Sequence, residues 1–251
     1  MRFRSLALLA STLLPMGATA LDGPVSLALA RKQVETADYR MVGHLVRVDE
    51  KGVRTSYGIN INAHWFPDEL RVLFEVVSPA DARVHVLLEM RSEGETTMQI
   101  AHPGDTRASS LPFEKWREGP LGAGFSYEDF LAPYFWQIQE DRGKAQFGMR
   151  NCDLLVSKPG AANRTHYSEV ESWLDAGSGY PVHVEKIMKG TGVVKEFNSM
   201  GLRQSQGVWY ASQVEEKMRG HSGSTLLVID RGSAKAHLDL KDFSSVQLTH
   251  F

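Results

Sequence analysis

Apolar and polar residues alternate along the first half of the chain. From Tyr57 to Trp65 every second residue is apolar, and the residues between them are glycine, asparagine or histidine. A period of two is typical of a β-strand that has one buried and one solvated face. Similar runs, separated by short turns rich in Gly, Pro, Ser and acidic residues, cover residues 39–49, 70–76, 84–90 and 98–100. Because short connections join antiparallel neighbours, the pattern predicts a meander with an apolar inner surface and a polar outer one.

The second half of the chain predicts another meander. A helix start signal and apolar spacing first predict a helix from Pro24 to Ala37, before the strands begin. Beyond the middle of the chain, Gly-rich turns separate strand-like runs. These runs cover residues 144–158 (a strand pair), 164–174, 182–189, 193–200, 208–218 and 224–230, with a closing strand expected within 241–251. The fold class is therefore mostly β (α+β), with antiparallel pairing.

The two halves are joined by a stretch of different character. From His102 to Gly124 the periodicity stops, and so long a loop in a compact domain is usually functional or mobile. Ser126 then has the position of a helix N-cap, with Asp129 three residues on as its acidic capping partner. The following apolar stripe predicts a helix, short or kinked at Pro133, that covers the sheet. The stripe consists of Phe130, Leu131, Tyr134 and Phe135.

The first twenty residues have the form of a secretory signal peptide. Arg2 and Arg4 give a basic start, residues 6–14 are apolar, and small residues precede a cleavage point near Ala20. No cysteine lies there to carry a lipid anchor, and no later segment approaches the ~20 apolar residues of a membrane span. We therefore expect an exported, soluble protein. Removing residues 1–20 changes the formal net charge from −2 to −4, and without basic clusters a nucleic acid partner is not expected.

Size and cysteine content set the remaining bounds. The roughly 231 residues left after cleavage could form one large β domain or two small ones, and we expect residues 21–251 to form a single domain. A chain of that length can bury ~70% of its unfolded surface without disulfides or metals. Cys152 is the only cysteine, which excludes an intramolecular disulfide, and its strand-like surroundings predict a buried structural thiol.

The chain offers weak candidates for chemistry. No pair of its nine histidines has the spacing of a helical metal site, and the strand histidines His44, His64 and His85 are expected to be solvated. Residues 220–224 contain His and Ser but lack the spacing and following helix of a nucleophile elbow, so a hairpin turn is expected. Capping and solvation explain the adjacent acids Glu128 and Asp129 better than acid–base catalysis does.

The Gly-rich residues 119–124 also lack the Lys-Ser/Thr of a phosphate loop. We therefore expect no catalytic residues, no metal site, no cofactor and no enzyme activity.

Several motifs nevertheless resemble those of one family. The stretch from Gly122 to Leu131 resembles the Phe-Ser-Tyr-Glu-Asp signature of LolA-like outer-membrane lipoprotein-sorting proteins, and departs from it at Ala123 and Gly124. Further motifs follow in the family's order and at about its spacing, so the resemblance covers about residues 70–230. They are Leu155-Val156-Ser157-Lys158-Pro159, Tyr167-Ser168, Trp173-Leu174-Asp175, Tyr180-Pro181, Gly192-Val193-Val194-Lys195, Trp209-Tyr210 and Gly220-His221 with Thr225.

This resemblance implies an open half-barrel, a strongly curved antiparallel sheet closed by a few helices around an apolar cavity for acyl chains. It implies a periplasmic carrier or chaperone for lipids or lipoproteins, with an inner-membrane RND (MMPL)-type transporter as a partner and a monomeric state. Combined with the alternating pattern, it predicts that the lipid-binding residues are Ile59, Ile61, Trp65, Val72, Phe74, Val86, Leu88 and Met98 on the sheet, and Phe130, Leu131, Tyr134 and Phe135 on the cover. The alternatives are a lipid-sensing regulatory module of the same fold (RseB-like) and, with less support, a hydrolase.

Overall fold

The computed structural model describes residues 25–92, 94–119 and 124–251. The signal peptide expected at residues 1–20, with its cleavage near Ala20, lies outside these ranges, as do Gly122 and Ala123 of the family-like stretch. No helix among the described residues is long and apolar enough to cross a membrane.

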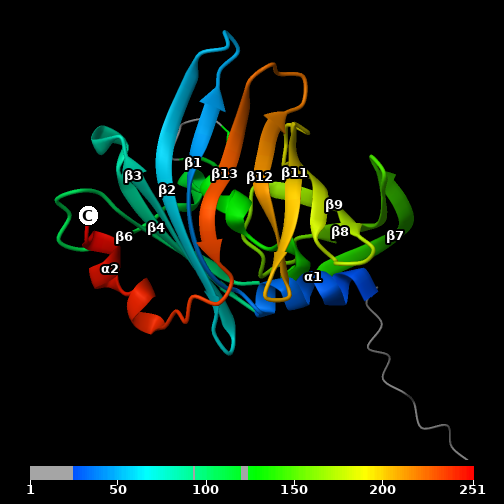
Figure 1. Ribbon diagram of the computed structural model, residues 1–251, viewed down its shortest axis with the longest axis horizontal. Helices are drawn as coiled ribbons and strands as arrows, with labels where there is room; N and C mark the ends of the chain where they lie inside the picture. The colour runs from blue at the N-terminus through cyan, green and yellow to red at the C-terminus, as the bar shows by residue number, and fades with distance from the viewer. Residues whose placement is uncertain (1–24, 93, 120–123) are drawn as a thin grey trace, which may run out of the picture.

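Within the described residues, thirteen antiparallel strands form one sheet (Figure 1). The first meander contains β1 Asp38–Val48, β2 Arg54–Trp65, β3 Glu69–Ser78, β4 Val84–Arg91, β5 Thr96–Ala101 and β6 Ser109–Ser110. The second contains β7 Ile138–Phe147, β8 Arg150–Lys158, β9 Tyr167–Asp175, β10 Pro181–Met188, β11 Val194–Ser205, β12 Val208–Met218 and β13 Ser224–Ser233. The alternating runs thus form strands as predicted, and the strand pair expected at 144–158 is the β7–β8 hairpin.

The two meanders join through the first and the last strand in the sequence. β1 pairs with β13, so that the order across the sheet runs from β6 through β1 and β13 to β7, and the sheet is not closed. A bulge between Val42 and Gly43 shifts the register of this seam. At Gly43 a Cβ atom would lie 2.0 Å from the Val228 carbonyl oxygen, so the seam requires a glycine there.

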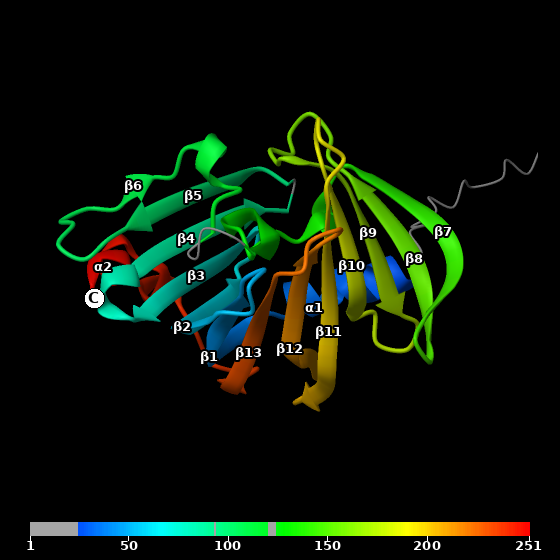
Figure 2. The same cartoon turned by 90° about the horizontal axis from the view of Figure 1, so that it is seen from above.

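One face of the sheet is covered by the N-terminal helix and by short turns from the connection between the meanders (Figure 2). The covering elements are α1 Val25–Glu35 and the 3₁₀ turns η2 Phe113–Lys115, η3 Tyr127–Phe130 and η4 Pro133–Phe135. The Arg31 side chain donates a hydrogen bond of 2.8 Å to the Tyr134 carbonyl oxygen, which ties α1 to η4. We call this covered side the inner face.

The helix predicted after Ser126 is not formed, because its pattern is divided between η3 and η4. The start is as expected, since the Ser126 N–H and hydroxyl both donate to the Asp129 carboxylate, at 2.7 and 2.8 Å. Pro133 then removes a backbone donor and disfavours helical backbone at the preceding residue. Leu131 and Ala132 are accordingly extended, with ψ of 140° and 100°.

The opposite face of β3 and β4 is also covered, which the alternating pattern did not predict. A turn η5 Leu240–Phe243 and a short helix α2 Ser245–Thr249 pack on Leu73 and Leu87 in place of the predicted closing strand. The Ser244 hydroxyl accepts a hydrogen bond of 3.2 Å from the Gln247 N–H, and this cap favours a helix over a strand. A further turn, η1 Ala80–Ala82, connects β3 to β4.

This C-terminal cover also corrects the expectation for His85. The His85 side chain is buried rather than solvated, because it stacks on Phe251 with ring centroids 4.0 Å apart. Its Nδ1 lies 2.9 Å from the Leu248 carbonyl oxygen. Burial, partly offset by Glu75, lowers the pKa of His85. Cys152 is buried as predicted, and its burial raises the pKa of the thiol.

Candidate functional site

A cavity of about 380 Å³ lies between the inner face and its cover. Its walls come from α1, from the segment 125–134 and from the strands on both sides of the β1–β13 seam. Most of the lining side chains are aliphatic or aromatic, and the volume falls within the usual range of small-molecule sites.

Five of the twelve predicted lipid-binding residues line this cavity: Ile61, Val72, Phe130, Leu131 and Tyr134. The other seven belong to the adjoining hydrophobic core, where side chains pack against one another: Ile59, Trp65, Phe74, Val86, Leu88, Met98 and Phe135. Trp65 stacks on Phe135 with ring centroids 5.0 Å apart, and Phe74 packs on Phe130 at 5.0 Å. The first meander therefore contributes more to dense core than to the cavity wall.

Much of the cavity wall belongs to the second meander, which the prediction left out. Val184 lies opposite Phe197 across the β10–β11 pair, and Val214 lies opposite Leu227 across the β12–β13 pair. All four residues line the cavity, as does Tyr180. Alternation is present in these strands too, but charged residues interrupt the apolar side of the pattern.

Those interruptions form a buried charged cluster around Asp129. Lys186 on β10 donates to the Asp129 carbonyl and carboxylate oxygens at 2.8 and 3.2 Å. Lys195 on β11, directly opposite Lys186, contacts the same carboxylate and donates to the Gly124 carbonyl at 2.8 Å. The Tyr167 hydroxyl adds a hydrogen bond of 2.6 Å. The pattern had predicted a solvated acid, but the Asp129 side chain is completely buried.

The surroundings of this cluster determine its charge state. Burial alone would raise the pKa of Asp129, but Lys195 and Lys186 hold the pKa of that carboxyl well below its usual range. Burial likewise lowers the pKa of Lys186, although Asp129 opposes the effect. A buried carboxylate between two ammonium groups is the stable arrangement, so the cluster ties η3 to two strands of the second meander.

Glu128 gives the cover a second attachment to the sheet. Its side chain is fully buried rather than solvated, and Oε2 accepts hydrogen bonds from the Thr165 hydroxyl at 3.2 Å and the His166 N–H at 3.0 Å. The His166 ring stacks on Phe113 with centroids 4.0 Å apart. The adjacent acids Glu128 and Asp129 thus have different partners, and they do not form an acid–base pair with each other.

The remaining chemical candidates have structural surroundings. His221 lies in the turn between β12 and β13, as the hairpin prediction requires, and its Nδ1 is 3.1 Å from a Glu50 carboxylate oxygen. In the part of the chain that the structure describes, no group of three or more His, Cys, Asp and Glu residues is arranged to hold a metal ion.

Comparison with known proteins shows the family and the fold. A domain from Vibrio parahaemolyticus described as an outer membrane lipoprotein-sorting protein superimposes with a TM-score of 0.78 at 16% identity, covering 89% of this chain and 98% of that one. A DUF1329 family protein from Desulfovibrio piger gives 0.78 at 15% identity, with coverage of 89% and 98%. A LolA superfamily protein from Nitrosomonas europaea gives 0.64 at 14% identity, with coverage of 87% and 99%.

No curated protein sequence is a significant match to the chain. A family model described as "Uncharacterized protein" matches residues 68–250. The chain therefore belongs to that family and has a LolA-like fold.

Proposed function

We propose that this protein is a periplasmic carrier that binds a lipid, or the acyl chains of a lipoprotein, in the cavity between the inner face and its cover. The observation that carries the proposal is the cavity itself, whose walls are largely apolar and come from α1, the cover and both meanders. Each CH₂ group that moves from water into such a wall gains ~0.8 kcal/mol, so an acyl chain binds without any specific polar partner.

The fold relatives support this direction. The similar domain from Vibrio parahaemolyticus is described as an outer membrane lipoprotein-sorting protein. An acylated cargo in water gains free energy when its acyl chains enter an apolar cavity. In this proposal residues 21–251 act as one domain, the curved sheet and its cover form an open half-barrel, and the protein is a monomer and not an enzyme. An inner-membrane RND-type transporter is the proposed source or recipient of the cargo.

The charged cluster fits a carrier of acyl chains rather than of ions. Asp129 and Lys186 both reach the cavity wall, but their charges compensate each other within it. The cavity therefore presents no uncompensated charge that demands an ionised ligand. The cluster instead holds in place the turn that carries Phe130 and Leu131, which form part of the cavity wall.

The test combines detection of a bound lipid with a variant that fills the cavity. Native mass spectrometry and lipid extraction of the mature protein from the periplasm should identify a co-purifying lipid or acylated species. Val214 is partly exposed in the cavity wall, so Val214→Trp should fill space without displacing packed neighbours. We expect uptake of a fluorescent fatty acid to weaken by about tenfold or more in Val214→Trp.

The matched control is Gln213→Trp, which places the same ring on the opposite face of β12, since neighbouring strand residues point to opposite faces. Uptake by this control should equal that of the wild type. A wild-type protein that carries no lipid and takes up no fatty acid, or equal uptake by both tryptophan variants, would rule out the cavity as the lipid site.

A further inference from the structure

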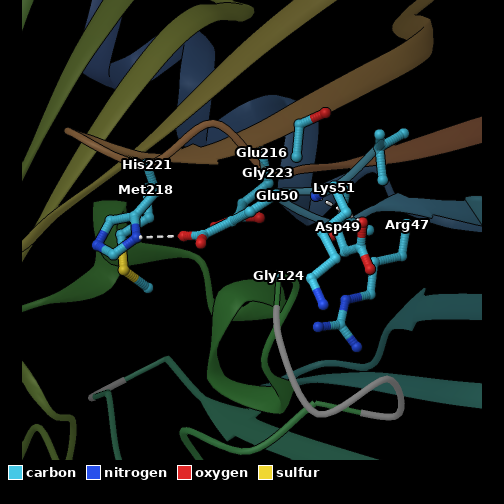
Figure 3. Close-up of a pocket in the computed structure, with 12 residues that line it drawn as sticks. Arg47, Asp49, Glu50, Lys51, Gly124, Glu216, Met218, His221 and Gly223 are labelled. Carbon is cyan, nitrogen blue, oxygen red and sulfur yellow. Dashed lines mark hydrogen bonds and ion pairs between the residues drawn. The ribbon is translucent and has the colours of Figure 1, made fainter. Parts of the chain in front are cut away.

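A second pocket, also of about 380 Å³, lies apart from the apolar cavity and is lined mainly by charged and polar residues, so we call it the polar pocket (Figure 3). It is bounded by the β1–β2 turn, by the β12–β13 turn and by Gly124 at the start of the cover. Figure 3 shows His221 with its partner Glu50 on one side of the pocket and Arg47 with Lys51 on the other. The two pockets share the inner face of β12 and β13, since Val214 and Leu227 line the cavity while Glu216 and Thr225, two positions along, line the pocket.

Glu216 is the buried acid of this pocket. Only 3% of the residue is exposed, and its side chain lies in the pocket wall beside Thr225, its cross-strand neighbour. Gly124 approaches both side chains closely: a Cβ atom there would lie 1.9 Å from the Thr225 hydroxyl oxygen and 3.2 Å from Glu216 Oε2. The left-handed backbone of Gly124, with φ of 95°, permits this approach.

Within the described ranges, the Glu216 carboxylate accepts no hydrogen bond and has no cation within ion-pair distance, unlike the other acids of the pocket. Glu50 pairs with His221. The Asp49 carboxylate accepts the backbone N–H groups of Lys51 and Val53, both at 2.9 Å. Lys195, whose charge acts on Glu216, is already bonded to Asp129 and Gly124. A buried carboxylate without donors is costly, and a ligand that brings donors removes that cost.

The oxygen atoms that line the pocket suit an ammonium group better than a metal ion. Glu216 supplies a carboxylate and Thr225 a hydroxyl oxygen, which suit the three N–H donors of a primary ammonium. A single carboxylate with one hydroxyl is a poor cation cage, and no group of three metal-ligating residues occurs among the described residues. An anion would approach the buried carboxylate unfavourably.

We propose that the polar pocket is a binding site for a primary ammonium group, which Glu216 and Thr225 hold at the pocket wall. The ammonium comes either from a small soluble amine or from the head group of an amine-bearing lipid. The site is separate from the apolar cavity, so ammonium binding there does not depend on lipid binding in the cavity.

The pH dependence of the site follows from burial. Desolvation, partly offset by Lys195 and Lys186 and reinforced by Asp129, raises the pKa of Glu216 to about 7. The other titratable groups around the pocket are Arg47, Asp49, Glu50, Lys51 and His221. Ammonium binding requires the ionised carboxylate, so affinity should rise as the pH increases through about 7 and fall again only where the amine loses its proton.

The test is a calorimetric titration of the mature protein with three compounds. They are ethanolamine, uncharged N-acetylethanolamine, and lysophosphatidylethanolamine below its micelle concentration. We expect ethanolamine, or the lysolipid alone, to bind wild-type protein and to bind Glu216→Gln at least about tenfold more weakly. Binding of both amines identifies a free amine as sufficient, whereas binding of the lysolipid alone identifies a lipid head group. Either result supports the site.

The matched control is Glu215→Gln, the neighbouring acid on the opposite face of β12, where it pairs with Lys217. It should bind as the wild type does. The exposed rim variant Lys51→Glu, which leaves the buried cluster intact, should strengthen amine binding severalfold even if Glu216→Gln folds poorly.

The proposal is overturned if N-acetylethanolamine binds as well as ethanolamine, or if neither amine binds at millimolar concentration. Lysolipid binding that is unchanged in a folded Glu216→Gln variant would also overturn it, and would assign that lipid to the apolar cavity instead.

Discussion

The inner faces of the two meanders are built from the same alternating pattern but differ in what they bury. In β2 to β5 the buried inner-face residues from Ile59 to Met98 are apolar except for Thr96, and most of them pack as core. In β10 to β12 the inner face also buries Lys186, Lys195 and Glu216. The first meander is thus stabilised by apolar burial, which has no preferred direction, whereas the second depends on partners at defined positions.

This difference indicates separate roles for the two halves. Buried charges are costly unless they meet an opposite charge with good geometry, and Asp129 supplies it from the cover. In the observed placement of η3 that carboxylate lies between the two lysines. We infer that the second meander specifies where the cover sits, while the first supplies most of the core.

The largest expected effect comes from removing the central acid. Asp129→Ala leaves Lys186 and Lys195 buried without a counter-ion, and should lower the free energy of unfolding by about 3–5 kcal/mol. Chemical denaturation of the purified protein measures this. Asp230→Ala is the control, because Asp230 is half exposed and, among the described residues, its ion-pair partner is His44; its effect should stay below about 1 kcal/mol. Equal losses in the two variants would contradict a special role for the cluster.

The first meander should respond to volume rather than charge. Leu88 is almost completely buried among packed side chains, so Leu88→Ala should cost about 2–5 kcal/mol and leave fatty acid uptake unchanged. Leu227 borders the cavity, so Leu227→Ala should cost less, because fewer contacts are lost, and should alter uptake. A Leu88 variant that folds but fails to take up lipid would contradict this assignment of core and cavity.

The pH dependence of stability should differ in sign between Glu216 of the second meander and Asp129 of the cover. The pKa of Glu216 is raised from its ordinary 4.5 to about 7, so its stabilisation is complete at low pH and is lost as the pH rises from about 4.5 to about 7. Glu216→Gln should remove this decline. The pKa of Asp129 is lowered, so its contribution is present above the ordinary value and is lost as the pH falls below it. Urea denaturation of wild type and Glu216→Gln from pH 4 to 8 tests the first sign, and urea denaturation of wild type and Asp129→Ala below pH 4 tests the second.

The smallest effect is expected for charges on the outer face. Arg219 donates to Glu196 at 2.5 Å and to Glu185 at 2.6 Å, but its side chain is half exposed. Arg219→Ala should cost no more than about 1 kcal/mol, and high salt should abolish the difference from wild type. A loss that matched Asp129→Ala would remove the distinction between inner and outer charges.

The strands were predictable because their signal is local. Alternation such as that from Tyr57 to Trp65 needs only neighbouring residues, and the turns between strands carry their own glycines and prolines. The covering elements were not predictable in the same way, because local signals conflict there. The Ser126 cap favours a helix, whereas Pro133 interrupts it. The C-terminal cap at Ser244 gave a helix where a strand was expected.

The charged cluster escaped prediction for a different reason. A lysine in an alternating strand pattern is typical of a solvated face. Its burial can be recognised only when its counter-ion, here Asp129, is known. Asp129 lies 57 residues before Lys186 and 66 before Lys195. The same limit explains why the sheet side of the predicted cavity wall was confined to the first meander, since the cavity extends across the β1–β13 seam.

That seam also governs how the molecule folds. Each meander consists of neighbours in sequence and can form from local contacts, but pairing of β1 with β13 closes a loop that contains nearly all the described strands. Closing so long a loop is entropically costly, so completion of the sheet should be a late and slow event. Until then β1 keeps an unpaired edge in the middle of the future sheet, open to pairing with another chain. A chaperone that occupies this edge until the sheet is complete would protect the protein at its most aggregation-prone stage.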